Sequence, residues 1–233
     1  MNTPFSDRTA AGRALAQRLM KMSWPGRTVV LALPRGGVPI GAEVARALGA
    51  PLDLLLVRKI GAPQQRELAV AAVVDGQPPD IVVDEETAAL AGVDRAWIDA
   101  QAAHELLEIE RRRRIYLGGR APLPVEGATV IVVDDGIATG TTVRAALKAL
   151  RRRKPARLVL AVPVAPSDTR AQLSAEVDDL VCLAEPSPFH AIGLHYIDFH
   201  QVGDDEVLAA LDAANAPPVQ LGAAARSPHG SRT

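Results

Sequence analysis

The sequence of 233 residues has little cysteine, few aromatic side chains and almost no net charge. Its single cysteine, Cys182, has no partner for an internal disulfide, and there is no C-x-x-C pair, so a disulfide scaffold and a cysteine-based zinc site are excluded. Aromatic residues make up 3% of the chain, so Ala, Val, Leu and Ile must build the core. Lys and Arg total 26 against 27 Asp and Glu, which provides no overall field for binding nucleic acid or an acidic membrane.

Long hydrophobic runs are also missing. The first twenty residues lack the continuous apolar segment of a signal peptide, and no run approaches the ~18 apolar residues of a membrane span. Together with the single cysteine, this predicts a cytoplasmic protein with neither nucleic acid nor membrane as a partner. Hydrophobic residues at 48% and charged residues at 23% are typical of a globular chain, and the length suits one large domain or one domain with an appendage.

Short apolar runs alternate with stretches of helical spacing along most of the chain. The runs predict strands at 28–33, 52–57, 68–74, 81–83, 129–133, 158–162 and 178–183. The helical stretches are 7–22, 39–48, 94–116, 143–153 and 204–211. Strand, glycine turn, helix and strand follow one another at 28–57 and again at 129–162, which indicates a doubly wound, mostly parallel α/β sheet.

Residues 1–211 are expected to form one domain. The stretch at about 75–127 separates the two repeated units without an obvious core of its own, so we interpret it as a helical insertion. A segment at about 184–202 follows the last strand and is interpreted as a small C-terminal hood. Residues 212–233 are Ala, Pro, Gly and Ser without periodicity, which predicts a disordered tail.

The stretch Val130–Thr142, VIVVDDGIATGTT, carries the most specific chemistry. A strand ends in Asp134 and Asp135, and a Gly/Thr turn then opens a helix. Because Gly136 and Gly140 let the backbone amides turn inward, and a helix start adds a positive dipole end, the turn is expected to bind phosphate. Gly140 is followed directly by Thr141 and not by the Lys of a G-x-x-x-x-G-K-[ST] motif, which excludes the P-loop of triphosphate enzymes. Two carboxylates beside a phosphate site suit a sugar phosphate such as ribose 5-phosphate.

The same stretch resembles the fingerprint of the type I phosphoribosyltransferases, which is a hydrophobic strand, an acidic pair and a G-x-x-T-G-x-T turn. The resemblance implies their doubly wound α/β fold and binding of 5-phosphoribosyl 1-pyrophosphate (PRPP). It implies that Asp134 and Asp135 take the ribose hydroxyls. The 5-phosphate would be bound by the turn, namely Gly136, Ile137, Ala138, Thr139, Gly140, Thr141 and Thr142. The alternative is an ordinary glycine turn behind an acidic strand end.

A second glycine turn, Pro34-Arg35-Gly36-Gly37, follows the first predicted strand. It resembles the pyrophosphate loop of the family, which implies that Arg35 and the backbone of Gly36 and Gly37 bind the leaving group. The planar guanidinium of Arg35 suits phosphate oxygens. Many members have a non-proline cis peptide in this loop, and Arg35–Gly36 is the expected position. Alternatively, this is one of the many Gly-Gly turns without a ligand.

Val57-Arg58-Lys59 resembles the V-R-K that precedes the mobile catalytic loop in adenine and orotate members of the family. The resemblance implies that Arg58 and Lys59 reach the pyrophosphate and that residues 61–67 form a lid that excludes water. Glu67, in this lid, is a candidate for handling the proton of the acceptor. The alternative is a solvated strand end.

Residues 185–202 are rich in proline and aromatic side chains, which predicts an ordered loop. The segment is loosely similar to the hood of purine salvage enzymes, which covers the nucleobase. This implies that Phe189 or Tyr196 stacks on an acceptor ring and that Asp198 reads the edge of the ring or assists the metal. The alternative is that Phe189, Tyr196 and Phe199 pack the loop against the domain.

No metal site made by the protein itself is expected. His190, His195 and His200 recur every five residues and therefore share no helix or strand face. The resemblance implies Mg²⁺ held through PRPP, bridging pyrophosphate and ribose oxygens. The basic run 111–114 has glutamates at i,i+4 spacing, and the run 151–154 lies at a predicted helix end, so both indicate solvated helix surfaces.

These features predict an enzyme that transfers phosphoribosyl from PRPP to a nitrogenous base or amine and releases pyrophosphate. The alternative is a non-catalytic PRPP or nucleotide sensor with the same fold, although an intact pyrophosphate loop and lid favour the enzyme. Ala138 stands where the 6-oxopurine members place an Asp, which argues against hypoxanthine or guanine and is more similar to the adenine members. Because the family usually forms dimers, a homodimer is also expected.

Overall fold

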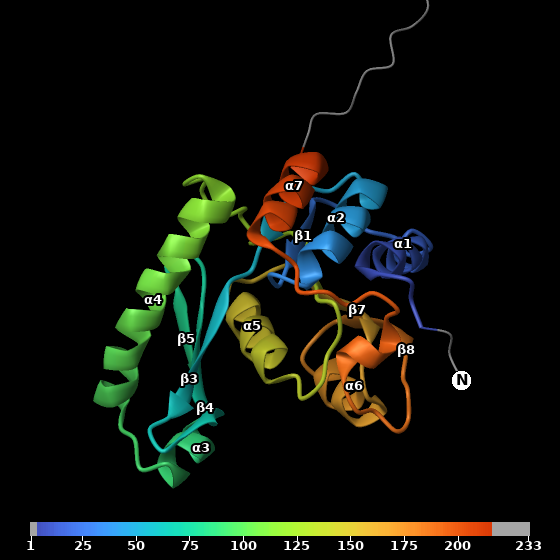
Figure 1. Cartoon of the computed structure of the whole chain (residues 1–233). Helices are drawn as coiled ribbons and strands as arrows, with labels where there is room; N and C mark the ends of the chain where they lie inside the picture. Colours follow the sequence, from blue (N-terminus) through green and yellow to red (C-terminus); the bar gives the residue numbers. More distant parts are fainter. Residues whose placement is uncertain (1–3, 216–233) are drawn as a thin grey trace, which may run out of the picture.

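A five-stranded sheet lies at the centre of the computed structural model, which describes residues 4–215 (Figure 1). Its strands, in spatial order, are β2 (Leu52–Leu54), β1 (Thr28–Ala32), β6 (Thr129–Val133), β7 (Arg157–Val164) and β8 (Asp179–Ala184). Every neighbouring pair is parallel. The first strand, β1, lies beside the edge strand β2, and the later strands β6, β7 and β8 extend the sheet in the opposite direction, which confirms the doubly wound α/β fold.

Helices cover both faces of this sheet. One face packs against α1 (Arg8–Leu19), α2 (Gly37–Leu48) and α7 (Asp204–Asn215). The other packs against α5 (Thr141–Arg152) and α6 (Ser167–Ser174), the second of which the sequence patterns did not reveal. In β1, Val30 points to the first face and Val29 to the second. Strands covered on both faces need apolar side chains in both directions, which explains runs such as TVVLA and TVIVV.

A second, antiparallel sheet is formed by β3 (Val57–Ala62), β4 (Gln65–Val74) and β5 (Asp80–Val83). Helices α3 (Glu85–Leu90) and α4 (Arg95–Leu117) pack on one side of it, and α5 lies on its other side (Figure 1). The stretch 52–57 is therefore two strands in different sheets, and not the single strand that its apolar run predicts.

The small sheet and its helices have an apolar core of their own, which corrects the expectation that the insertion lacks one. Its buried members include Leu56, Ile60, Val70, Val73 and Ile98. This core could not be recognised from the sequence, because its residues come from both sides of position 75, where the insertion is expected to start. The core makes the small sheet a second packed layer beside α5.

Helix α7 continues to Asn215, beyond the expected domain boundary at 211. The side chain of Asn215 hydrogen-bonds both the backbone N–H and the C=O of Leu52, at 3.1 and 3.0 Å, and so joins the end of α7 to the edge strand β2. Residues 216–233 of the predicted tail lie outside the described residues. Within the described part of the chain, none of the helices has the combination of length and apolar character that crossing a membrane requires.

Candidate functional site

A cavity of about 130 Å³ lies where the carboxyl end of the parallel sheet meets the start of the small sheet. Its wall combines residues that are far apart in the sequence: Leu33, Pro34, Leu55, Leu56, Val57, Arg58, Arg112, Asp134 and Thr142. The carboxyl edge of an open parallel sheet is the usual position of a ligand in this architecture. The cavity brings together the glycine turn after β1, the acidic pair after β6, the turn before α5 and the basic residue of β3.

The turn after β1 packs directly against the acidic pair. A Cβ atom on Gly36 would overlap the carboxylate of Asp135, and one on Gly37 would lie 2.8 Å from the carbonyl oxygen of Val133. Both positions therefore require glycine for close approach. The peptide Pro34–Arg35 is cis, one bond before the expected Arg35–Gly36.

The side chain of Arg35 is held by the start of α7. Its Nη1 lies 3.4 Å from Oδ1 of Asp204, and the same oxygen accepts a hydrogen bond of 2.6 Å from the hydroxyl of Tyr116 on α4. The hydrogen bond from Tyr116 and the charge of Arg35 lower the pKa of Asp204. The ionised Asp204 thus joins the glycine turn to two helices.

The two carboxylates of the acidic pair have different surroundings. Asp134 lines the cavity, and its Oδ1 accepts a hydrogen bond of 2.8 Å from the backbone N–H of Asp135. Burial raises the pKa of Asp134 well above 3.8, and the charge of Asp135 raises it further. Asp135 instead accepts a hydrogen bond of 2.9 Å from Nε of Arg8, in an ion pair. Burial raises the pKa of Asp135 as well, although Arg8 opposes that shift.

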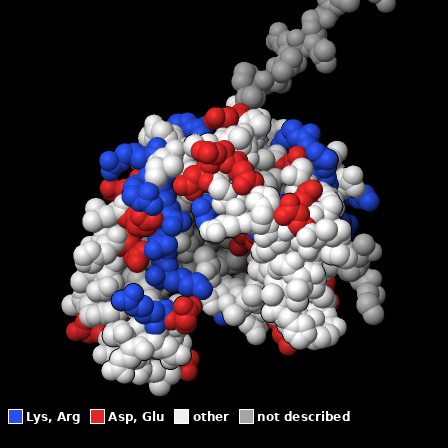
Figure 2. All heavy atoms as spheres, viewed as in Figure 1, with Lys and Arg blue, Asp and Glu red and all other residues white. Residues whose placement is uncertain are grey.

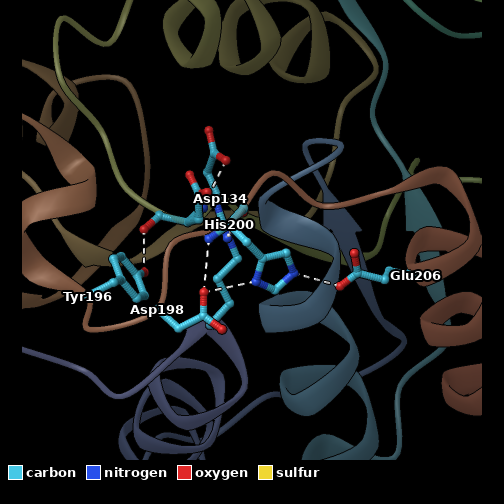
Figure 3. A network of polar contacts seen from close by, with 7 residues as sticks. Asp134, Tyr196, Asp198, His200 and Glu206 are labelled. Atoms are coloured by element: carbon cyan, nitrogen blue, oxygen red, sulfur yellow. Dashed lines mark hydrogen bonds and ion pairs between the residues drawn. The ribbon is translucent and has the colours of Figure 1, made fainter.

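Tyr196, a predicted acceptor-stacking residue, is 6% exposed and packs against the acidic pair. Its hydroxyl donates a hydrogen bond of 2.5 Å to the backbone carbonyl of Asp135 (Figure 3). The guanidinium of Arg8 lies 3.9 Å from the centre of the Phe199 ring and donates to the carbonyl of His200. These contacts match the alternative that the aromatic rings pack the hood down.

The other predicted acceptor residues lie further out in the hood, which contains the short 3₁₀ helix η1 (Ile192–His195). Phe189 is half-buried and stacked on His195, with ring centres 5.4 Å apart. Asp198 is exposed and accepts from the backbone and the ring of His200, whose other ring nitrogen lies 2.9 Å from Glu206 on α7 (Figure 3). The hydrogen bonds with Glu206 and Asp198 raise the pKa of His200.

The predicted phosphate turn is fixed by its backbone. Ile137 is buried and donates from its N–H to the carbonyl of Val164, while the hydroxyl of Thr169 donates to the carbonyl of Ala138, each at 2.9 Å. A Cβ on Gly136 would lie 2.6 Å from a methyl group of Ile192, so this glycine too is required by packing.

The turn leads into α5 through Gly140, which precedes the helix with φ +74°, a conformation that favours glycine. The hydroxyls of Thr139 and Thr141 are 3.3 Å apart and Thr142 lines the cavity. Helix starts leave backbone N–H groups free to bind an anion, so the geometry suits a phosphate.

Arg58 and Lys59 extend to opposite faces of the small sheet. Arg58 lines the cavity and forms an ion pair of 2.7 Å with Glu105 on α4. Lys59 is exposed and, by strand alternation, shares the opposite face with Val57, whose side chain packs with the core under α5. Segment 61–67 is the tip of the β3–β4 hairpin and not an irregular loop, and Glu67 is exposed on β4, outside the cavity wall.

Four residues of the site were not predicted: Arg8, Arg112, Tyr116 and Asp204. The spacing of the basic run predicts a solvated helix surface for Arg112, yet this residue lines the cavity. Arg8 pairs with a residue 127 positions away, so no local spacing could indicate the contact. Residues 4–215 contain no group of three or more His, Cys, Asp or Glu side chains arranged to bind a metal.

Residues 7–196 match the family model described as a phosphoribosyl transferase domain. This chain therefore belongs to the phosphoribosyl transferase domain family. It is 44% identical over 219 residues to "Putative phosphoribosyl transferase Rv0571c" of Mycobacterium tuberculosis H37Rv, and equally to the corresponding protein of strain CDC 1551. The match covers 94% of this chain and 49% of each relative, so the chain spans about half the length of these proteins.

Among solved structures, the protein TT1426 from Thermus thermophilus is similar to this chain with a TM-score of 0.76 and 40% identity. The similarity covers 90% of this chain and 98% of that protein. Most of this chain thus has a counterpart in a crystal structure.

Proposed function

We propose that this chain transfers the phosphoribosyl group of PRPP to a nitrogenous base or amine and releases pyrophosphate. One observation carries the proposal: a single cavity is lined by Pro34, Asp134 and Thr142. These residues represent the three segments that family resemblance assigns to the pyrophosphate, the ribose and the 5-phosphate. Segments that are separate in the sequence therefore lie within reach of one small ligand.

In the proposed complex, the 5-phosphate binds at the turn 136–142. Its oxygens accept hydrogen bonds from the backbone N–H groups that open α5 and from the threonine hydroxyls of the turn. Each hydrogen bond to a charged oxygen contributes roughly 1.5–3 kcal/mol. Asp134 accepts hydrogen bonds from the ribose hydroxyls, and the pyrophosphate lies against the turn 34–37 and the guanidinium of Arg58.

During the reaction, the bond between C1 of the ribose and the pyrophosphate oxygen breaks, and a nitrogen of the acceptor forms a bond to the same carbon and releases its proton to water. The pyrophosphate leaves with the electron pair of the broken bond. Cationic groups already fixed beside it stabilise the charge that develops on it. The ribose becomes positively charged in the transition state, and the carboxylate of Asp134 orients it and complements this charge.

Mg²⁺ suits this arrangement as an ion bound mainly by the substrate. Among the described residues, Asp134 is the only carboxylate in the cavity wall. A single carboxylate matches the way Mg²⁺ binds in phosphate sites, where phosphate oxygens and water complete its six ligands. When bound, the ion neutralises part of the charge of the pyrophosphate.

For the acceptor we propose contact with Phe189, because Tyr196 is buried and already hydrogen-bonded to Asp135. Ala138 stands in the phosphate turn where the 6-oxopurine members of the family place an Asp, which favours acceptors other than 6-oxopurines. The choice between a base and an amine stays open in this proposal.

The proposal is tested by measuring pyrophosphate release from PRPP and Mg²⁺ over a panel of bases and amines. We expect release with at least one acceptor and none with Asp134→Asn, while the exposed-helix variant Asp99→Asn behaves as the wild type. Binding of PRPP without turnover for every acceptor would instead establish a PRPP sensor. If PRPP does not bind at all, both functions are excluded.

A further inference from the structure

Helix α4 contributes a side chain to the cavity, although the sequence placed it in an insertion outside the site. Arg112 lies in the wall together with Pro34, Arg58 and Asp134. In Figure 2, Lys and Arg side chains gather along one wall of the hollow at the centre of the molecule. Helix α4 is therefore part of the site and not a separate appendage.

Neighbouring arginines on α4 differ in this respect. Arg111 and Arg112 each donate from Nε to Glu108, both at 2.7 Å. The side chain of Arg111 is 60% exposed, whereas that of Arg112 is 30% exposed and borders the cavity. The spacing of the basic run identified the ion pair with Glu108 but could not show which arginine faces the main domain.

The two arginines of the cavity wall keep donors free for a ligand. Arg58 and Arg112 hydrogen-bond described residues only through Nε, to Glu105 and Glu108 respectively. A guanidinium has five N–H donors in a planar fork, so both Nη groups of each arginine remain available for an anion. Glu108 retains Arg111 as a partner if Arg112 turns toward a ligand, which keeps the cost of that movement low.

The position of Arg112 relative to the glycine turn is fixed by Tyr116, one helical turn further along α4. The hydroxyl of Tyr116 donates to Asp204, which also pairs with Arg35 of the glycine turn. Burial, followed by the hydrogen bond to Asp204, raises the pKa of Tyr116, so the hydroxyl keeps its proton at neutral pH. This connection holds the end of α4 against the turn proposed to bind pyrophosphate.

We propose that Arg112 binds the pyrophosphate group of PRPP directly, as a cation that α4 supplies opposite the glycine turn. This inference rests on the proposed function and adds a substrate-binding residue to it. Arg112 and Arg58 approach the pyrophosphate oxygens together, each able to make two parallel hydrogen bonds. The ribose and the 5-phosphate are bound by other segments, so Arg112 acts on the leaving group alone.

The test compares Arg112→Ala with Arg111→Ala, a matched variant that removes an arginine from the same glutamate but not from the cavity. Calorimetric titrations use PRPP and inorganic pyrophosphate, each with Mg²⁺, and ribose 5-phosphate. We expect Arg112→Ala to weaken binding of PRPP and pyrophosphate roughly 10- to 100-fold. Ribose 5-phosphate should bind unchanged, and Arg111→Ala should bind all three as the wild type does.

A third variant, Arg112→Lys, keeps the charge but loses the planar fork, and its affinity for pyrophosphate should be intermediate. Equal pyrophosphate affinity of Arg112→Ala and Arg111→Ala, with the wild type binding, would overturn the assignment of Arg112 and leave the proposed function standing. A wild type that binds neither PRPP nor pyrophosphate would overturn both. Because exposed ion pairs contribute about 0–1 kcal/mol, both alanine variants should fold normally, which thermal unfolding verifies.

Discussion

Arg8, the first residue of α1, forms an ion pair of 2.9 Å with Asp135, and their side chains are only 9% and 13% exposed. The contact joins the first helix to the acidic pair, and the same guanidinium holds the hood through the carbonyl of His200. Asp135 is thereby directed to Arg8, whereas Asp134 lines the cavity. The adjacent carboxylates are thus suited to two tasks, one facing the ligand and the other joining three parts of the fold.

Removing either partner of this ion pair should destabilise the protein strongly, because the other charge is left buried. We expect Arg8→Met and Asp135→Asn each to lower the free energy of unfolding by roughly 3–5 kcal/mol. The double variant should lose much less than the sum of the two. Urea unfolding of the four proteins measures this, and strictly additive losses would contradict a direct coupling.

Asp134→Asn should have the opposite effect and stabilise the protein. The folded state raises the pKa of Asp134 above 3.8, so it binds the proton more tightly than the unfolded chain does. Stability therefore falls as pH rises from about 3.8 through the raised pKa, and the asparagine variant avoids this loss. Melting curves against pH should diverge across that window, with the variant higher by roughly 2–4 °C for each kcal/mol relieved. Identical melting curves would show that the ionised side chain of Asp134 does not destabilise the folded state. If Asp134→Asn is more stable than the wild type, it should also have lost PRPP binding.

The contact of His200 with Asp198 and Glu206 predicts a pH-dependent attachment of the hood to α7. Because the pKa of His200 is raised in the folded state, its contribution to stability is complete below about pH 6.5. The contribution is lost as pH rises through the pKa of His200 in the folded protein. The lowered pKa values of Asp198 and Glu206 mean that these carboxylates contribute fully to stability above about pH 3.8 for Asp198 and about pH 4.5 for Glu206. Their contribution is lost in more acidic solution. His200→Gln should therefore lower the melting temperature slightly between about pH 4.5 and 6.5, and less at pH 8. The exposed His104→Gln serves as the control, and a deficit independent of pH would contradict the prediction.

Gly37→Ala should disrupt the turn that contacts the acidic pair. The added methyl group would meet the backbone of Val133 and Asp134 at 2.8 and 2.9 Å, and backbone atoms yield little. We expect a loss of roughly 1–3 kcal/mol in stability together with weaker pyrophosphate binding. Gly203→Ala is the matched control, since its Cβ would approach only the side chain of Glu206, at 3.5 Å. Equal stability of the two variants would contradict the steric argument.

Most elements of the parallel sheet, and the family, could be predicted from the sequence because the patterns that indicate them lie within short stretches of the chain. A strand such as Thr129–Val133 is apolar on both faces, and the turn after it carries its own chemistry. The small sheet was only partly recognised, because pairing between β3 and β4 is not encoded in either strand alone. The sequence predicted the acidic pair but not the different positions of its two carboxylates, because that difference depends on the ion pair of Asp135 with the distant Arg8. Likewise, the basic run on α4 has the same i,i+4 pattern whether or not one arginine faces a cavity.

Leu55 and Leu56, between β2 and β3, belong to different apolar cores, and both lie in the wall of the cavity. The chain passes from one core to the other at a single peptide bond, and the proposed substrate site is built along that boundary. Its width is therefore set jointly by the packing of two cores, which meet across the small sheet. A substitution deep in either layer can therefore change ligand affinity without touching the ligand.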